Sequence, residues 1–112
     1  METTRQQKIA RLLQKDLASI FQQEAKLRFG NALITVMKVT VTKDLSIARI
    51  YLSIFTTGSK AEILNHILPH TREIRNLLAI RVKHQLRIIP QLEFYIDDSL
   101  DYIENIDNLL KQ

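Results

Sequence analysis

The spacing of apolar residues changes along this chain, and those changes restrict its fold more than any other feature. Between positions 9 and 21, apolar side chains recur at every third or fourth residue, which predicts a helix with one buried face. Residues 33–42 are rich in Val, Ile and Thr, and residues 47–56 alternate between apolar and other side chains, so both segments are predicted to be strands. The five-residue polar connection between the two strands favours an antiparallel pair.

The first helix is predicted to span residues 4–28. Thr3 and Thr4 each precede a glutamine by three positions, which is the spacing of a capping box at a helix start. Gly30 suits the end of the helix, because glycine adopts the left-handed conformation at low cost. The predicted buried face holds Ile9, Leu12, Leu13, Leu17, Ile20 and Phe21.

Two helical patterns follow the strands. Ser59 and Glu62 have capping-box spacing at the start of a short helix. Pro69 interrupts this helix, and a second helical pattern continues to about Arg87. Two helices joined at a bend and one helix kinked at Pro69 both fit the pattern. The apolar positions of the short helix are Ile63, Leu64, Ile67 and Leu68, and those of the second pattern are Ile74, Leu77, Leu78, Val82 and Leu86.

A third strand and a short tail complete the chain. Leu92, Phe94 and Ile96 alternate with polar or amphipathic residues after Pro90, which predicts a strand with one buried face. Ser99 is a candidate cap for an acidic helix with apolar Leu100, Ile103, Ile106 and Leu110. We therefore expect an α+β fold in the order α-β-β-α-α-β, with helices covering one face of a three-stranded sheet. Residues 1–97 would form one domain, and residues 98–112 an acidic amphipathic tail.

Charge is distributed unevenly along the chain. The sequence has 16 Lys and Arg against 12 Asp and Glu, a net charge of +4. The last 16 residues hold five acids and one base, so residues 1–96 carry a net charge of +8. A compact basic body predicts a polyanionic partner, either nucleic acid or an anionic membrane surface.

The basic residues fall on two predicted helical faces. Lys8, Arg11 and Lys15 lie within about 60° of one another on the side opposite the apolar face, and Arg5 lies beside them. In the second region, Arg72, Lys83 and Arg87 cluster away from the apolar side, whereas Arg81 projects toward it and is expected to cover the core with its aliphatic stem. A solvated charged face is the ordinary alternative for each set, but two such faces on one small domain favour salt-dependent binding of RNA or DNA.

The sequence offers little for catalysis or metal binding. There is no cysteine, and the only glycines, Gly30 and Gly58, form neither a P-loop nor a dinucleotide motif. His66 and His70 have a spacing that can hold a metal, but Pro69 lies between them and no third ligand is evident. We expect a non-enzymatic protein with no cofactor, no metal and no small-molecule substrate.

No apolar run approaches the roughly 18 residues of a membrane helix, and the N-terminus shows no apolar signal segment. These features predict a cytoplasmic protein, and we expect a monomer that does not bind membranes.

Short motifs in this sequence resemble the ribosome-binding factor A family. They are the run Leu86-Arg87-Ile88-Ile89-Pro90-Gln91-Leu92-Glu93-Phe94, the segment Asp97-Asp98-Ser99-Leu100, the turn Asp44-Leu45-Ser46-Ile47-Ala48 and the tail Asp101-Tyr102-Ile103-Glu104-Asn105-Ile106. The resemblance implies a type II KH-like fold, the free small ribosomal subunit and its rRNA as partners, and a role in late maturation of that rRNA. It also implies a role in processing the 5′ end of the rRNA, with the greatest need in the cold.

One segment departs from the family pattern. The family has an Ala-x-Gly kink between its two consecutive helices, whereas this chain has His70-Thr71-Arg72. Without glycine the backbone cannot approach RNA as closely, so we expect side-chain contacts from Arg72 and Arg75. The predicted RNA-binding residues are Arg5, Lys8, Arg11, Lys15, Arg72, Arg75, Lys83 and Arg87. The competing hypothesis is a protein-interaction module that docks through the C-terminal helix.

Overall fold

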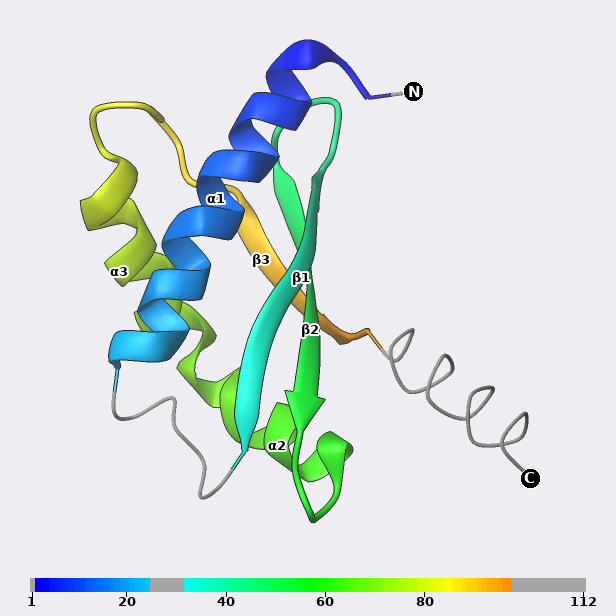
Figure 1. Cartoon of the computed structure of the whole chain (residues 1–112). Coiled ribbons are helices and arrows are strands. Elements are labelled where there is room, and N and C mark those ends of the chain that lie inside the picture. Colours follow the sequence, from blue (N-terminus) through cyan, green and yellow to red (C-terminus); the bar gives the residue numbers. More distant parts are fainter. Residues whose placement is uncertain (1, 25–31, 98–112) are drawn as a thin grey trace.

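The computed structural model describes residues 2–24 and 32–97, whose arrangement is drawn in Figure 1. The elements are α1 (Thr4–Gln23), β1 (Leu33–Val41), β2 (Ile47–Phe55), α2 (Lys60–Ile67), a 3-10 turn (Leu68–His70), α3 (Thr71–Val82) and β3 (Gln91–Ile96). This order confirms the predicted α+β fold and agrees with the α-β-β-α-α-β order of a type II KH-like domain. Gly30, proposed as the helix stop, and the predicted tail at 98–112 lie outside the described residues.

Helix α1 begins as predicted and ends earlier than predicted. The Thr3 hydroxyl accepts a hydrogen bond from the Gln6 amide at 3.1 Å, and the Gln6 side chain accepts one from the Thr3 amide at 2.8 Å, which completes a capping box. Glu24 is already extended, so the predicted end at residue 28 is wrong. Continuation would place the Glu24 charge beside Ile20 and Phe21, where the buried face needs an apolar side chain.

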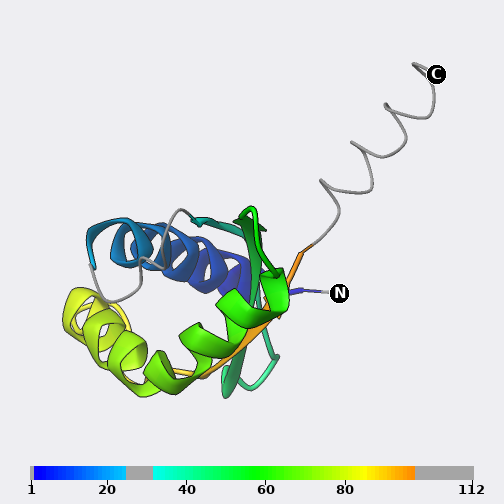
Figure 2. The same ribbon diagram turned by 90° about the horizontal axis from the view of Figure 1, so that it is seen from below.

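The sheet has the strand order β1-β2-β3. Strands β1 and β2 are antiparallel, as predicted for their short connection, and β2 and β3 are parallel. The register of the β1–β2 pair shifts between Val36 and Lys38, where β1 contains an irregularity. The helices lie on one side of the sheet, as the view in Figure 2 shows.

The core lies between the helices and this face of the sheet. The apolar positions of β2 (Ala48, Ile50, Leu52 and Ile54) are all buried, as the alternation predicted. Their partners from the helices include Leu13, Leu17, Ile67, Ile74, Leu78 and Val82. On the opposite face, the rings of Tyr51 and Tyr95 stack with centroids 5.4 Å apart.

The α2–α3 region resolves the alternative that the sequence left open. Two helices are joined by the 3-10 turn that contains Pro69. Leu68, predicted on the apolar face, is 44% exposed, because the turn rotates it away from the core. Helix α3 ends at Val82, so its predicted extension to Arg87 is wrong. The Val82 carbonyl accepts bonds from the amides of Gln85 and Leu86, which closes a turn in place of a further helical turn.

Two glutamine side chains of α1 form hydrogen bonds with β1. Strand β1 lies at the edge of the sheet, and Gln6 donates to the Val41 carbonyl at 2.8 Å. Gln14 donates to the carbonyls of Val36 and Met37 at 3.3 Å each. Backbone groups on an edge strand need such partners or water. The two glutamines therefore hold α1 against the edge strand.

Arg81 fastens α1 to α3. Its guanidinium donates to the Ser19 hydroxyl at 3.0 Å and to the Gln23 side-chain oxygen at 2.8 Å. Arg81 was expected to cover the core with its stem; the structure shows instead an exposed guanidinium that bridges two helices. This bridge fixes the relative position of the two helices that carry most of the predicted RNA-binding residues.

Candidate nucleic-acid interface

The first group of candidate residues is exposed along α1, with Arg5 beside the row of the other three, and we call the whole group the basic stripe: Arg5, Lys8, Arg11 and Lys15. Gln14 marks the side of α1 that faces β1, and Ser19 marks the side that faces α3. At 100° per residue, Lys8, Arg11 and Lys15 project between these two sides, away from both neighbours. A rise of 1.5 Å per residue gives the stripe a length of about 15 Å.

The second group does not form the single helical face that was predicted. Arg72 lies in the first turn of α3, whereas Lys83 is its C-cap, about 16 Å further along the helix axis. Arg87 lies beyond the helix, in the loop that leads to β3. All three side chains are exposed. At 100° per residue Arg72 and Lys83 project from the same face of α3 at its two ends, so only Arg87 leaves the predicted face.

Arg75 has a structural contact that the sequence did not reveal. Its guanidinium donates to the Ile89 carbonyl at 2.8 Å and to the Pro90 carbonyl at 3.3 Å. These bonds tie α3 to the residues just before β3. Arg75 thus holds the loop that carries Arg87, in addition to the RNA contact predicted for it.

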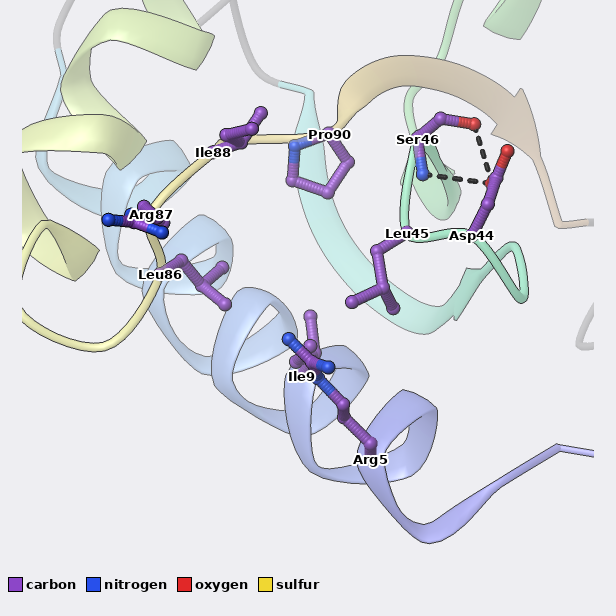
Figure 3. Close-up of a pocket in the computed structure, with 9 residues that line it drawn as sticks. All are labelled: Arg5, Ile9, Asp44, Leu45, Ser46, Leu86, Arg87, Ile88 and Pro90. Atoms are coloured by element: carbon purple, nitrogen blue, oxygen red, sulfur yellow. Dashed lines mark hydrogen bonds between the residues drawn. The ribbon is translucent and has the colours of Figure 1, made fainter.

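A pocket of about 380 Å³ brings together three segments that are distant in the sequence, as drawn in Figure 3. We call it the Arg5 pocket. Arg5 and Ile9 come from α1, and the other lining residues come from the β1–β2 turn and the loop before β3: Asp44, Leu45, Ser46, Leu86, Arg87, Ile88 and Pro90. A neighbouring hollow of about 370 Å³ shares Arg5, Ile9 and Leu86 and adds Lys8. Arg5, Lys8 and Arg87 therefore border one continuous region.

Hydrogen bonds hold the β1–β2 turn in a defined shape. The Asp44 carboxylate accepts from the Ser46 hydroxyl at 2.7 Å, the Thr42 hydroxyl at 2.8 Å and the Ser46 amide at 3.1 Å. These bonds to Ser46 and Thr42 hold the pKa of Asp44 below its ordinary value. The Gln91 amide donates to the Ser46 carbonyl at 2.8 Å, which links the turn to β3.

The sequence did not single out the apolar part of this pocket. Leu45 is an apolar residue within an otherwise polar turn, and this was the available signal. Leu86 was assigned to a helical face, which hid its position in the loop. The three segments meet only through tertiary packing.

Other kinds of site find little support in the described part of the chain. Among residues 2–24 and 32–97, no three His, Cys, Asp or Glu side chains are placed to hold a metal. His70 instead lies 3.6 Å from the Glu73 carboxylate. None of the helices in these ranges combines the length and the apolar character that crossing a bilayer requires.

Comparison with known proteins identifies the family. A family model described as ribosome-binding factor A matches residues 5–110. A ribosome-binding factor A from Cytophaga hutchinsonii is 46% identical over 112 residues, covering 100% of this chain and 84% of the relative. The chain belongs to the ribosome-binding factor A family.

Solved structures of the family have the same fold. The crystal structure of ribosome-binding factor A from Thermus thermophilus is 27% identical, with a TM-score of 0.67 over 81% of this chain and 94% of that one. A Thermus thermophilus homology model fitted into a cryo-EM map of a 30S–RbfA complex is 29% identical, with a TM-score of 0.64 over 80% and 91% of the two chains. The family resemblance read from the sequence is thus confirmed.

Two of the motifs that carried the resemblance meet in the Arg5 pocket. Asp44-Leu45-Ser46 lies on one side of it, and Leu86, Arg87, Ile88 and Pro90 lie on the other. The segment that departs from the family pattern, His70-Thr71-Arg72, lies at the start of α3, next to α2. In Figure 1, α2 lies at the opposite end of the domain from the β1–β2 turn. The departure therefore leaves the pocket segments unchanged.

Proposed function

We propose that this protein is a non-enzymatic assembly factor that binds the free small ribosomal subunit through its 16S rRNA. Membership of the ribosome-binding factor A family supports the subunit as partner, and a Thermus relative has been fitted into a map of its 30S complex. The uncovered basic stripe is the observation that carries the RNA contact. Cations in one exposed row neutralise consecutive phosphates and release their counterions.

The mechanism we propose is binding without bond-making. The basic stripe contacts phosphates, while the links from α1 to β1 and α3 keep its charges at fixed spacing. A rigid row of cations fits one arrangement of the RNA backbone better than others. The protein thus stabilises an immature rRNA arrangement and leaves when maturation removes that arrangement.

A charge-reversal experiment tests the RNA contact. The variant Arg11→Glu with Lys15→Glu changes the stripe outside the Arg5 pocket, and Lys38→Glu with Lys60→Glu is a control with the same charge change on β1 and α2. We expect at least tenfold weaker co-sedimentation with small subunits for the stripe variant only. Loss of two phosphate contacts should also flatten the slope of log affinity against log salt by about 1.4–1.8. Equal binding by the two variants, both folded, would reject the stripe as the RNA contact.

We further propose that the protein supports late 16S rRNA maturation, including 5′-end processing, and that this support matters most in the cold. The basic stripe connects rRNA binding with rRNA maturation, because a variant that cannot bind the rRNA cannot assist its maturation. Cells carrying only the stripe variant should accumulate 16S rRNA with an unprocessed 5′ end, more at 15 °C than at 37 °C. Primer extension measures this, and normal processing with a binding-deficient variant would contradict it.

A further inference from the structure

The inner surface of the Arg5 pocket is apolar. In Figure 3 the side chains of Leu45 and Leu86 point toward each other across the pocket, and Ile9 lies beside the space between them. Pro90 adds a further apolar surface, whereas Asp44 and Ser46 bond to each other on the outer side. The surface between the two leucines is therefore apolar, and the Arg5 side chain passes in front of it.

Leu45 is held in a conformation that leucine rarely adopts. Its φ is 63°, in the left-handed region, where a residue with a Cβ is disfavoured by about 1–2 kcal/mol. The Leu45 amide donates to the Thr42 carbonyl at 2.8 Å, and Thr42, Asp44 and Ser46 bond around it. Glycine or asparagine would fit this backbone with less strain. The turn instead carries an apolar side chain, and it directs that side chain into the pocket.

Cations flank this apolar surface. In Figure 3 the Arg5 side chain passes in front of Ile9, and Arg87 lies beyond Leu86 and points away from the centre. Lys8 lines the neighbouring hollow. Within the described residues, none of these three cations takes part in an ion pair. The pocket therefore combines an apolar lining with cations in front of Ile9 and beyond Leu86 that are available to an anionic ligand.

We propose that the Arg5 pocket binds one unpaired base of the rRNA, a step that rests on the proposed function. The base lies between Leu45 and Leu86. The phosphate on one side of the base contacts Arg5 and Lys8, and the phosphate on its other side contacts Arg87. Proteins recognise single-stranded RNA in this way, by taking up an unstacked base and contacting its backbone. A volume of about 380 Å³ lies within the range of sites that hold small organic molecules.

A nucleotide fits these observations better than an apolar side chain of a ribosomal protein. An apolar side chain would use the leucines but would leave the two flanking cationic positions unused. A nucleotide presents a neutral base between two anions, which matches the order of apolar and cationic groups across the pocket. This charge complementarity selects RNA as the occupant.

The first test compares RNA with and without bases. Fluorescein-labelled decauridylate, decaadenylate and a ten-residue ribose-phosphate chain lacking bases are titrated with the protein, and fluorescence anisotropy gives the affinities. We expect at least one base-containing RNA to bind at least tenfold more tightly, about 1.4 kcal/mol, than the chain without bases. Equal affinities for all three would overturn the proposal, because phosphate contacts alone would explain the binding.

The second test uses neutral substitutions with matched controls. Leu45→Asn keeps the left-handed turn and removes the apolar side chain, and Leu33→Asn is its control at a 64% exposed leucine of β1. Ile88→Asn alters the pocket at a 77% exposed position, and Ile80→Asn is its control at a 67% exposed position of α3. We expect the two pocket variants to bind small subunits at least tenfold more weakly, with an unchanged salt slope. The controls should stay within twofold of the natural protein.

The outcomes separate this proposal from the proposed function. If the natural protein does not bind small subunits at all, the proposed function fails. If it binds, and only the basic-stripe variant weakens binding, the function stands and the base pocket is rejected. Benzoylphenylalanine at position 88 gives an independent result with the natural subunit. A photo-crosslink to an rRNA nucleotide supports the proposal, and a crosslink only to a ribosomal protein overturns it.

Discussion

Replacement of Gln6 by alanine should destabilise the protein far more than replacement of its neighbour Gln7. Gln6 is a buried polar residue, 6% exposed, whose amide group donates to the Val41 carbonyl and whose oxygen accepts from the Thr3 amide. Alanine leaves that edge carbonyl without its partner, which costs about 1–3 kcal/mol. Loss of half of the capping box adds about 0.5–1 kcal/mol. Together these effects predict a loss of about 2–4 kcal/mol from the free energy of unfolding.

Urea denaturation followed by circular dichroism measures this loss. Gln7→Ala is the control because Gln7 is exposed on the same helical turn, so both variants share the change in helix propensity. The control should stay within about 0.5 kcal/mol of the natural protein. The Gln6 variant should also melt about 8–16 °C lower, at about 4 °C per kcal/mol for a chain of this size. A loss below about 1 kcal/mol would refute the reasoning, since water would then serve the Val41 carbonyl as well as Gln6 does.

Three further predictions follow from the contacts described. Leu78→Ala removes a fully buried side chain and should cost about 2–5 kcal/mol in urea denaturation; a smaller loss would show that the core collapses into the space. Arg81→Met removes the hydrogen bonds from α3 to Ser19 and Gln23 and should lower the free energy of unfolding by about 1 kcal/mol. The slope of log affinity for small subunits against log salt should stay unchanged, because no phosphate contact is lost. Asp44→Asn should destabilise the protein at pH 7, and the gap from the natural protein should shrink as the pH falls through the lowered pKa of Asp44. The ionised carboxylate stabilises the turn only above that pKa, so a gap that stays constant in denaturation midpoints between pH 7 and pH 3 would contradict this role.

The elements were predictable where one face of each is buried. In β2 and β3, alternation placed Ala48, Ile50, Leu92 and Phe94 correctly in the core, because a strand buried on one side has a strict period of two. The helix ends were less predictable. Residues 83–87 have side chains compatible with a helix, and the turn bonded to Val82 arises from the path that the chain must take to β3.

The charged residues of the candidate site could be predicted from the sequence, but the pocket that they border could not. Exposed cations on α1 follow directly from the helical period, so the basic stripe could be read from the sequence. The Arg5 pocket could not, because Leu45 and Leu86 are 41 positions apart and meet only after β3 pairs with β2. The bonds of Arg75 and Arg81 were missed for a similar reason. A sequence shows that an arginine is present, but only packing shows which carbonyl or hydroxyl lies within its reach.

The parallel pairing of β2 with β3 has a consequence for synthesis of the chain. Parallel strands need a long crossover, and here the crossover contains α2 and α3, so β3 joins the sheet last. A nascent chain that stops before Gln91 already carries the basic stripe, but it lacks the strand that fixes the loop from Leu86 to Pro90 beside Leu45. On the proposed function, unfinished chains would attract RNA through charge alone, and recognition through the Arg5 pocket would begin only after β3 has joined the sheet.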